Sequence, residues 1–260
     1  MDTKEFSRVT VSMLIWAAAS QIGFAAEAGF AGNWKLNLAK SQLTGQTFNF
    51  EKTPSGMMHF DSQGWAYDFN PDGKEYASPD GSVVVVRPVD ANTWDWTMSM
   101  HGKVTMTIRS TVHGDTATFV MRVNKPDGSV VEQSSTATRV SGGPGLLGKW
   151  KSTEVKGAPT SLTIETKGKK GITVTYPEFQ QVCKGRFDGK DHTVSQAGAA
   201  SKMTCAFERT GANAFKVTTR LQGKPFYTDV FTLSPDGNTL LDEGNPASVN
   251  EPVKSVYERQ

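Results

Sequence analysis

Apolar and polar residues alternate with a period of two along most of the chain after residue 30. In the segment 92–100, with the sequence NTWDWTMSM, the tryptophans and methionines fall on one face and most polar residues on the other. The segments 118–123, 161–166 and 214–221 alternate in the same way. A period of two is typical of strands that turn one face toward a core, and no segment after residue 30 has a helical period. The pattern therefore predicts an all-β protein.

Turn signals separate the predicted strands. Asp-Gly pairs begin at Asp72, Asp80, Asp127, Asp188 and Asp236. Each pair predicts a hairpin with a type I′ turn, in which both central residues have positive φ. Calcium loops are excluded, because none of these turns has acidic residues at alternating positions that close on a glutamate. About eight or nine short strands fit into each half of the chain, and such a unit is expected to close or stack to hide its edges.

The two halves of the chain are similar in sequence. GNWK at 32–35 returns as GKWK at 148–151, and DGK at 72–74 returns at 188–190, so both offsets are 116 residues (148 − 32 and 188 − 72). Two later pairs have an offset of 121: ANTW and ANAF, beginning at Ala91 and Ala212, and HGK and QGK, ending at Lys103 and Lys224. Such self-similarity predicts an internal repeat. We expect one barrel over residues 29–141, a linker over 142–147 and a second barrel over 148–260.

Each half begins with Gly-x-Trp, containing Trp34 or Trp150, and ends on a strand with an arginine, Arg139 or Arg259. This pairing resembles the lipocalin-type (calycin) β-barrels, and GNWKLNLAKS is similar to the opening of small secreted bacterial proteins with lipocalin-like domains. The resemblance implies two tandem antiparallel lipocalin-like barrels. It also implies that in each half the first-strand Trp packs under the last-strand Arg, a favourable contact that closes one end. The other end would stay open.

Residues 1–28 are expected to be a secretory signal peptide. Lys4 and Arg8 form a basic start, residues 9–19 a short apolar core, and small residues near 25–28 a cleavage site. The apolar run is shorter than the ~18 residues of a membrane span, and no later segment is long enough. We therefore expect a periplasmic or secreted protein without an integral membrane segment after cleavage.

Charge and cysteine content narrow the function further. The net charge is +2, and cleavage would change it by at most one unit, so nothing indicates nucleic acid as a partner. Cys183 and Cys205 are the two cysteines of the chain, 22 residues apart, with no neighbouring histidine to complete a zinc site. In an oxidising compartment such a pair predicts a disulfide.

The sequence contains no recognisable catalytic, metal or cofactor motif. Gly143, Gly148 and Lys149 imitate part of a phosphate-binding loop, but Trp150 stands where Ser or Thr is needed. Neither a GxSxG motif nor paired metal-binding histidines occur, so we expect no metal and no cofactor. An enzyme would need a polar side chain that points into a barrel, and Arg109, Asp95 and His59 are the first candidates.

The first half is rich in methionine and tryptophan. Methionine lines surfaces that accept irregular apolar partners, and tryptophan supplies large rigid walls. The sequence therefore predicts a pocket for a small apolar or aromatic molecule in the first barrel, with these lining residues: Met58, Phe60, Trp94, Trp96, Met98, Met100, Phe119 and Met121. The same residues would equally well form an ordinary core. A periplasmic protease inhibitor or other protein-interaction module, and an enzyme for an apolar substrate, stay open as alternatives.

Overall fold

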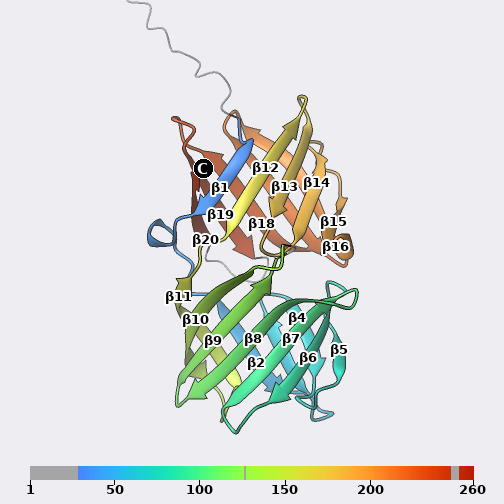
Figure 1. Cartoon of the computed structure of the whole chain (residues 1–260), viewed down its shortest axis with the longest axis vertical. Coiled ribbons are helices and arrows are strands. Elements are labelled where there is room, and N and C mark those ends of the chain that lie inside the picture. Colours follow the sequence, from blue (N-terminus) through green and yellow to red (C-terminus); the bar gives the residue numbers. More distant parts are fainter. Residues whose placement is uncertain (1–28, 126, 247–251) are drawn as a thin grey trace, which may run out of the picture.

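The computed structural model describes residues 29–125, 127–246 and 252–260, and these residues form an all-β protein (Figure 1). As predicted, the strands are antiparallel and make two barrel-like sheets, each of ten strands. Helical structure within the described ranges is limited to the 3-10 turn η1 (Leu38–Lys40). No helix in these ranges is long and apolar enough to cross a membrane. The expected signal peptide, residues 1–28, lies outside the described residues.

Barrel 1 is the lower sheet in Figure 1, and its edge strands β4 and β5 contact one another. Its strands are β2 (Thr47–Lys52), β3 (Met58–Ser62), β4 (Trp65–Phe69), β5 (Glu75–Ala77), β6 (Val83–Pro88), β7 (Thr93–Met100), β8 (Lys103–His113), β9 (Thr116–Asn124), β10 (Val130–Ser141) and β11 (Gly148–Gly157).

Barrel 2 is the upper sheet, and it is closed. Its strands are β1 (Gly32–Leu36), β12 (Ser161–Lys167), β13 (Gly171–Tyr176), β14 (Gln181–Arg186), β15 (His192–Gln196), β16 (Ala199–Gly211), β17 (Ala214–Leu221), β18 (Lys224–Leu233), β19 (Thr239–Pro246) and β20 (Val253–Arg259). Each barrel thus has one or two strands more than the sequence predicts, partly because a segment as short as β5 shows no alternation.

The first strand of each half lies in the barrel of the other half. Strand β1 pairs with β12 and β20 of barrel 2, whereas β11 pairs with β10 and β2 of barrel 1. The expected division at 29–141 and 148–260 is therefore wrong for one strand of each half, because β1 lies in barrel 2 and β11 lies in barrel 1. Residues 142–147 are not a linker between barrels but the turn of the β10–β11 hairpin. The chain crosses between barrels instead at residues 37–46 and again at 158–160.

The Trp–Arg contacts follow this exchange. The guanidinium carbon of Arg259 lies 4.2 Å from the ring centre of Trp34, and that of Arg139 lies 4.1 Å from the ring centre of Trp150. Both indoles are fully buried. The resemblance implied the same residue types at the closed ends, but with Trp34 under Arg139 and Trp150 under Arg259. Each tryptophan thus packs under an arginine, as the resemblance implied, but the arginine comes from the other half of the chain.

The two closed ends are built from equivalent contacts. The indole N–H groups of Trp34 and Trp150 donate to the carbonyls four residues earlier, of Phe30 and Leu146, at 3.0 and 2.8 Å. Arg259 donates to the carbonyls of residues 31 and 29, and Arg139 to those of residues 147 and 145. Each pair of carbonyls is related by the offset of 116 residues found in the sequence.

Each Asp-Gly pair connects two consecutive strands, but the turns are not of type I′. The glycines have positive φ, from 70° at Gly189 to 96° at Gly81, whereas none of the five aspartates does. Each Asp side chain instead accepts a hydrogen bond from the backbone N–H two residues later. An Asx turn followed by a left-handed glycine is the alternative that this dipeptide also permits.

Cys183 on β14 and Cys205 on β16 form the predicted disulfide, with Cα atoms 6.3 Å apart. Strand β15 lies beside both cysteines, since Val194 pairs with Cys183 and His192 with Cys205. An isolated bridge between Phe187, which follows β14, and Phe207, in the middle of β16, joins these two strands directly. The disulfide therefore joins β14 to β16 beside the first residues of β15.

The barrels meet end to end (Figure 1), and the contacts between them come from turns at the ends opposite the Trp–Arg plugs. The side chain of Gln180 donates to the carbonyl of Asn124 at 2.7 Å, and the amide of Lys202 donates to the carbonyl of Asp80 at 2.9 Å. The rings of Trp65 and Phe226 lie 5.8 Å apart across the same junction. Consecutive hairpin turns alternate between the two ends of a barrel. The turns that make these contacts lie at the end away from the Trp–Arg plug, so the two unplugged ends face each other.

Candidate functional site

Barrel 1 contains a cavity of about 420 Å³ in its unplugged half. Its apolar wall comes from Phe48, Phe60, Ile108, Phe119, Met121 and Val155, on strands β2, β3, β8, β9 and β11. The position of each follows from alternation, because each lies on the strand face that turns inward. The volume falls within the ~300–1,000 Å³ typical of small-molecule pockets.

Aromatic rings form one side of the cavity. The ring of Phe48 packs against that of Phe119 at 5.3 Å, nearly perpendicular, and lies 6.5 Å from that of Phe60. Phe50 continues this cluster into the core, 4.9 Å from Phe60 and 5.8 Å from Trp96. Edge-to-face contacts of this kind hold rings in fixed orientations. The wall therefore presents a fixed apolar surface to the cavity.

Polar side chains line the junction end of the cavity. Ser152 donates to the side-chain oxygen of Gln46 at 3.1 Å, and Gln133 donates to the carbonyl of Ala158 at 2.9 Å. The side-chain nitrogen of Gln63 is buried without a hydrogen-bond partner. An unsatisfied buried donor is costly, so Gln63 is suited to donate to an acceptor on a bound molecule.

Three of the eight predicted ligand-binding residues line this cavity, namely Phe60, Phe119 and Met121. The other five share the inward face but lie outside the lining. Met58, Trp96 and Met100 are buried in the interior, and Trp94 and Met98 pack partly buried against the core. The indole N–H of Trp96 donates to the buried hydroxyl of Ser110 at 2.8 Å, which fixes Trp96 as part of the core.

Sequence reasoning missed Phe48, Ile108 and Gln63. Phe48 and Phe50 alternate with polar residues in TFNFEK, which is the signal that could have placed Phe48 inside. Ile108 shares its face with Met106 in the same way. Gln63 could not have been found, because it lies in the β3–β4 turn and has a positive φ of 58°.

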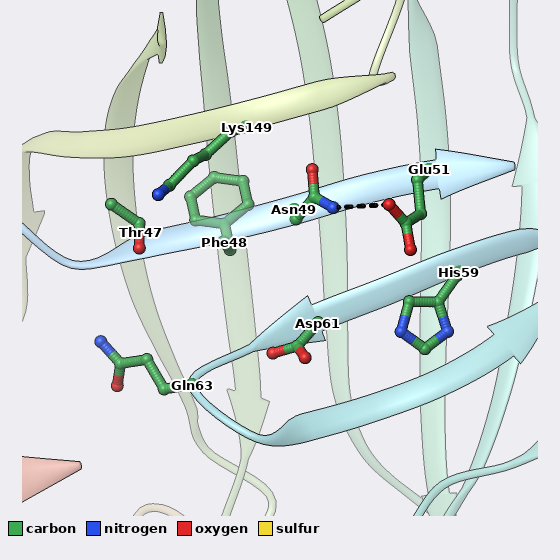
Figure 2. A pocket seen from close by; sticks show the side chains of 8 residues that line it. All are labelled: Thr47, Phe48, Asn49, Glu51, His59, Asp61, Gln63 and Lys149. Carbon is green, nitrogen blue, oxygen red and sulfur yellow. Dashed lines mark hydrogen bonds between the residues drawn. The ribbon is translucent and has the colours of Figure 1, made fainter. Parts of the chain in front are cut away.

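A second, smaller hollow of about 240 Å³ lies on the outer face of β2 and β3 (Figure 2). Figure 2 shows the side chains of Glu51, His59 and Asp61 there, with Lys149 from β11 above them. Asn49 donates to Glu51 at 3.2 Å, and Nδ1 of His59 lies 2.6 Å from a carboxyl oxygen of Asp68. Because neighbouring side chains already bind Glu51 and His59, and the hollow is smaller and mainly polar, it is a weaker candidate than the cavity.

The polar residues proposed for an enzyme do not reach the cavity. Arg109 forms a two-pronged ion pair with Asp95, with both N–O distances 2.7 Å, on the outer face of β7 and β8. His59 faces outward from β3. Asp95 has a lowered pKa because Arg109 hydrogen-bonds to it. These contacts are those of a surface ion pair, and they bring no reactive group to the cavity.

No family model, curated protein or solved structure matches the chain. Within the described ranges, no three His, Cys, Asp or Glu side chains gather closely enough to hold a metal ion.

Proposed function

We propose that the protein is an exported, lipocalin-like binding protein that holds one small apolar or aromatic molecule in barrel 1. The observation that supports this most strongly is the 420 Å³ cavity with an aromatic wall and a polar junction end. Apolar surface drives the binding of such a molecule, and a few polar groups orient it.

The lining also favours a particular kind of ligand. The wall near Phe48, Phe119 and Met121 carries no ionisable side chain, and the polar lining consists of serine and glutamine. A charged group would lose its hydration there without a compensating partner. The ligand is therefore uncharged, with an acceptor such as a carbonyl or hydroxyl oxygen that reaches Gln63.

Equilibrium dialysis tests the proposal with uncharged aromatic and aliphatic compounds that fit a cavity of this size. One molecule per chain should bind saturably, and compounds with an oxygen acceptor should bind better than hydrocarbons of the same shape. A Gln63→Leu variant should remove this preference without abolishing binding of the hydrocarbons. Absence of saturable binding by every member of the panel would refute the proposal.

A further inference from the structure

Barrel 2 carries a polar layer inside an otherwise apolar interior. Phe231 and Leu233 on β18 and Leu240 on β19 belong to its buried core. By alternation, Asp229 and Asp242 turn toward the same interior. Asp242 is 8% exposed. Two carboxyl groups thus lie on strand faces whose other inward residues are large and apolar.

Three tyrosines surround this carboxyl pair. Tyr227 lies on the strand of Asp229, Tyr257 is buried in the same core, and Tyr176 packs against that core from β13. Burial, and then the nearby carboxyls of Asp229 and Asp242, raise the pKa of all three phenols. The five side chains therefore form one cluster, and the phenols are neutral.

Gly244 makes room for the cluster. A Cβ atom at this position would overlap the ring and hydroxyl group of Tyr227. Gly244 follows Asp242 on the inward face of β19, so its missing side chain lets the Tyr227 ring pack across β19 beside the carboxyl pair.

The negative groups of this layer have no cationic partner among the described residues. No lysine, arginine or histidine lowers the pKa of either carboxyl; burial raises the pKa of Asp229 to about 7, and burial and the neighbouring carboxyl raise that of Asp242. The carboxyl groups of Asp229 and Asp242 lie close enough for each to change the pKa of the other. Oδ1 of Asp242 is nevertheless buried without a partner, and so is the side-chain oxygen of Gln196. Both oxygens are therefore acceptors without a donor.

The cluster borders an open space. Asp229, Tyr176 and Tyr227 turn into the barrel by alternation, and each keeps part of its surface accessible. A side chain that faces the interior and keeps accessible surface borders a space that its neighbours do not fill. The void lies toward the junction, because the opposite end of barrel 2 is filled by Phe215, Phe231 and the buried Trp34.

We propose that the interior of barrel 2 is a second binding site, which takes a small organic cation of the alkylammonium type. The carboxyl pair supplies the counter-charge, the orphaned oxygen of Asp242 supplies an acceptor, and the tyrosine rings supply the electron-rich faces that attract such cations. A metal ion fits less well, because Ca²⁺ needs six to eight oxygen ligands. The site is separate from the barrel 1 cavity and independent of its proposed ligand.

Calorimetric titration of the whole protein with choline and with its uncharged carbon isostere, 3,3-dimethylbutan-1-ol, tests this inference. The two probes differ in charge and hardly in shape. Choline should bind about tenfold or more tightly than the alcohol, as expected for a desolvated cation over aromatic rings. Equal binding of the two probes, or no binding of either, overturns the proposal and needs no variant.

Variants then locate the site. Asp242→Asn should weaken choline binding about tenfold or more, whereas Glu208→Gln, a surface carboxyl on β16 that pairs with Lys216, should leave it unchanged. If Asp242→Asn does not fold, Asp229→Asn and Tyr227→Leu serve the same purpose. A variant that fills the barrel 1 cavity, Ser135→Phe, should not change choline binding; if it does, the cation binds in barrel 1 and the assignment is wrong.

The pH dependence gives a readout that a purely structural carboxyl pair would not produce. Choline keeps its charge at every pH, so its affinity should rise from pH 5 to pH 8 as the carboxyl pair becomes ionised. The titratable groups inside the barrel are Asp229, Asp242 and the phenols of Tyr176, Tyr227 and Tyr257. Glu243, on the outer face of β19, adds a negative charge that also raises the pKa of Asp242, and Val217 and Thr219 from β17 do not ionise. A flat profile in the wild-type protein would contradict the site.

Discussion

Arg259 stacks on Trp34, although 225 residues (259 − 34) separate them, and Arg139 stacks on Trp150 in the same way. Each contact joins a first strand from one half of the chain to the last strand of the other half. The exchange ties the two barrels together, because neither half contains all the strands of one barrel. It also brings the unplugged ends face to face at a junction lined by Gln63 and Phe226.

Engineered disulfides test the exchange. Lys35 pairs with Glu258 across β1 and β20, and the equivalent neighbours in barrel 1 are Lys151 and Thr138. Paired strand residues lie ~4.5–5.5 Å apart, within reach of a disulfide. Lys35→Cys with Glu258→Cys should therefore cross-link, as peptide mass spectrometry would show. Lys35→Cys with Thr138→Cys should not, and efficient cross-linking of this second pair would mean that each half folds on its own.

The Trp–Arg plug should contribute strongly to stability. Trp34 is fully buried, so Trp34→Ala should lower the free energy of unfolding by ~3–5 kcal/mol in denaturant titrations. Val104→Ala, at a position that is 43% exposed, should change it by less than ~0.5 kcal/mol. A loss below ~1 kcal/mol for Trp34→Ala would contradict the role of the plug.

The sequence was sufficient to predict the elements but not their assembly. Alternation in segments such as 92–100 predicts strands because it is a local signal. Cys183 and Cys205 predict the disulfide because the chain contains no other cysteine. The exchange was not predictable from the motifs, since GNWK and GKWK are equivalent and either can complete either barrel. The short turn at 142–147 favours pairing of β10 with β11, because strands joined by a short connection usually pair.

The site was predicted only in part for a related reason. Alternation identifies which side chains face inward, and it does so correctly for Phe60 and Phe119. It does not distinguish an inward residue that packs against others, such as Trp96, from one beside a void, because that depends on which strands lie opposite. The polar layer of barrel 2 did leave a signal: Asp229 and Asp242 interrupt apolar faces.

The disulfide should stabilise barrel 2. Titration of the unfolded, unreduced protein should find no free thiol. Replacing both Cys183 and Cys205 by serine should lower the free energy of unfolding by about 3 kcal/mol, as expected from chain entropy for a loop of this length. Two free thiols in the unreduced protein would show that the bond does not form.

The carboxyl pair of barrel 2 should make stability depend on pH. Burial raises the pKa of Asp229 from its ordinary value of 3.8 to about 7, so between these values the folded protein binds more protons than the unfolded chain. The stability that this proton confers is fully present below pH ~4 and is lost as the pH rises through ~7. The free energy of unfolding should therefore fall over this range, by at most ~1.4 kcal/mol per pH unit for each proton.

Denaturant titrations between pH 4.5 and pH 8 would measure this slope. The double variant Asp229→Asn with Asp242→Asn should show a flatter profile than the wild type, because its amides do not titrate. If the two profiles run parallel, the carboxyls are not protonated in the folded protein.

The most direct test of the proposed function is the binding of N-phenyl-1-naphthylamine, an uncharged apolar fluorophore, to the wild-type protein and two variants. Ser135 lines the barrel 1 cavity, whereas Thr136 follows it on β10 and turns the other way. Ser135→Phe fills the cavity and should weaken binding about tenfold or more, whereas Thr136→Phe should bind like the wild type. Equal binding by all three proteins, or no binding by the wild type, would contradict a ligand site in barrel 1.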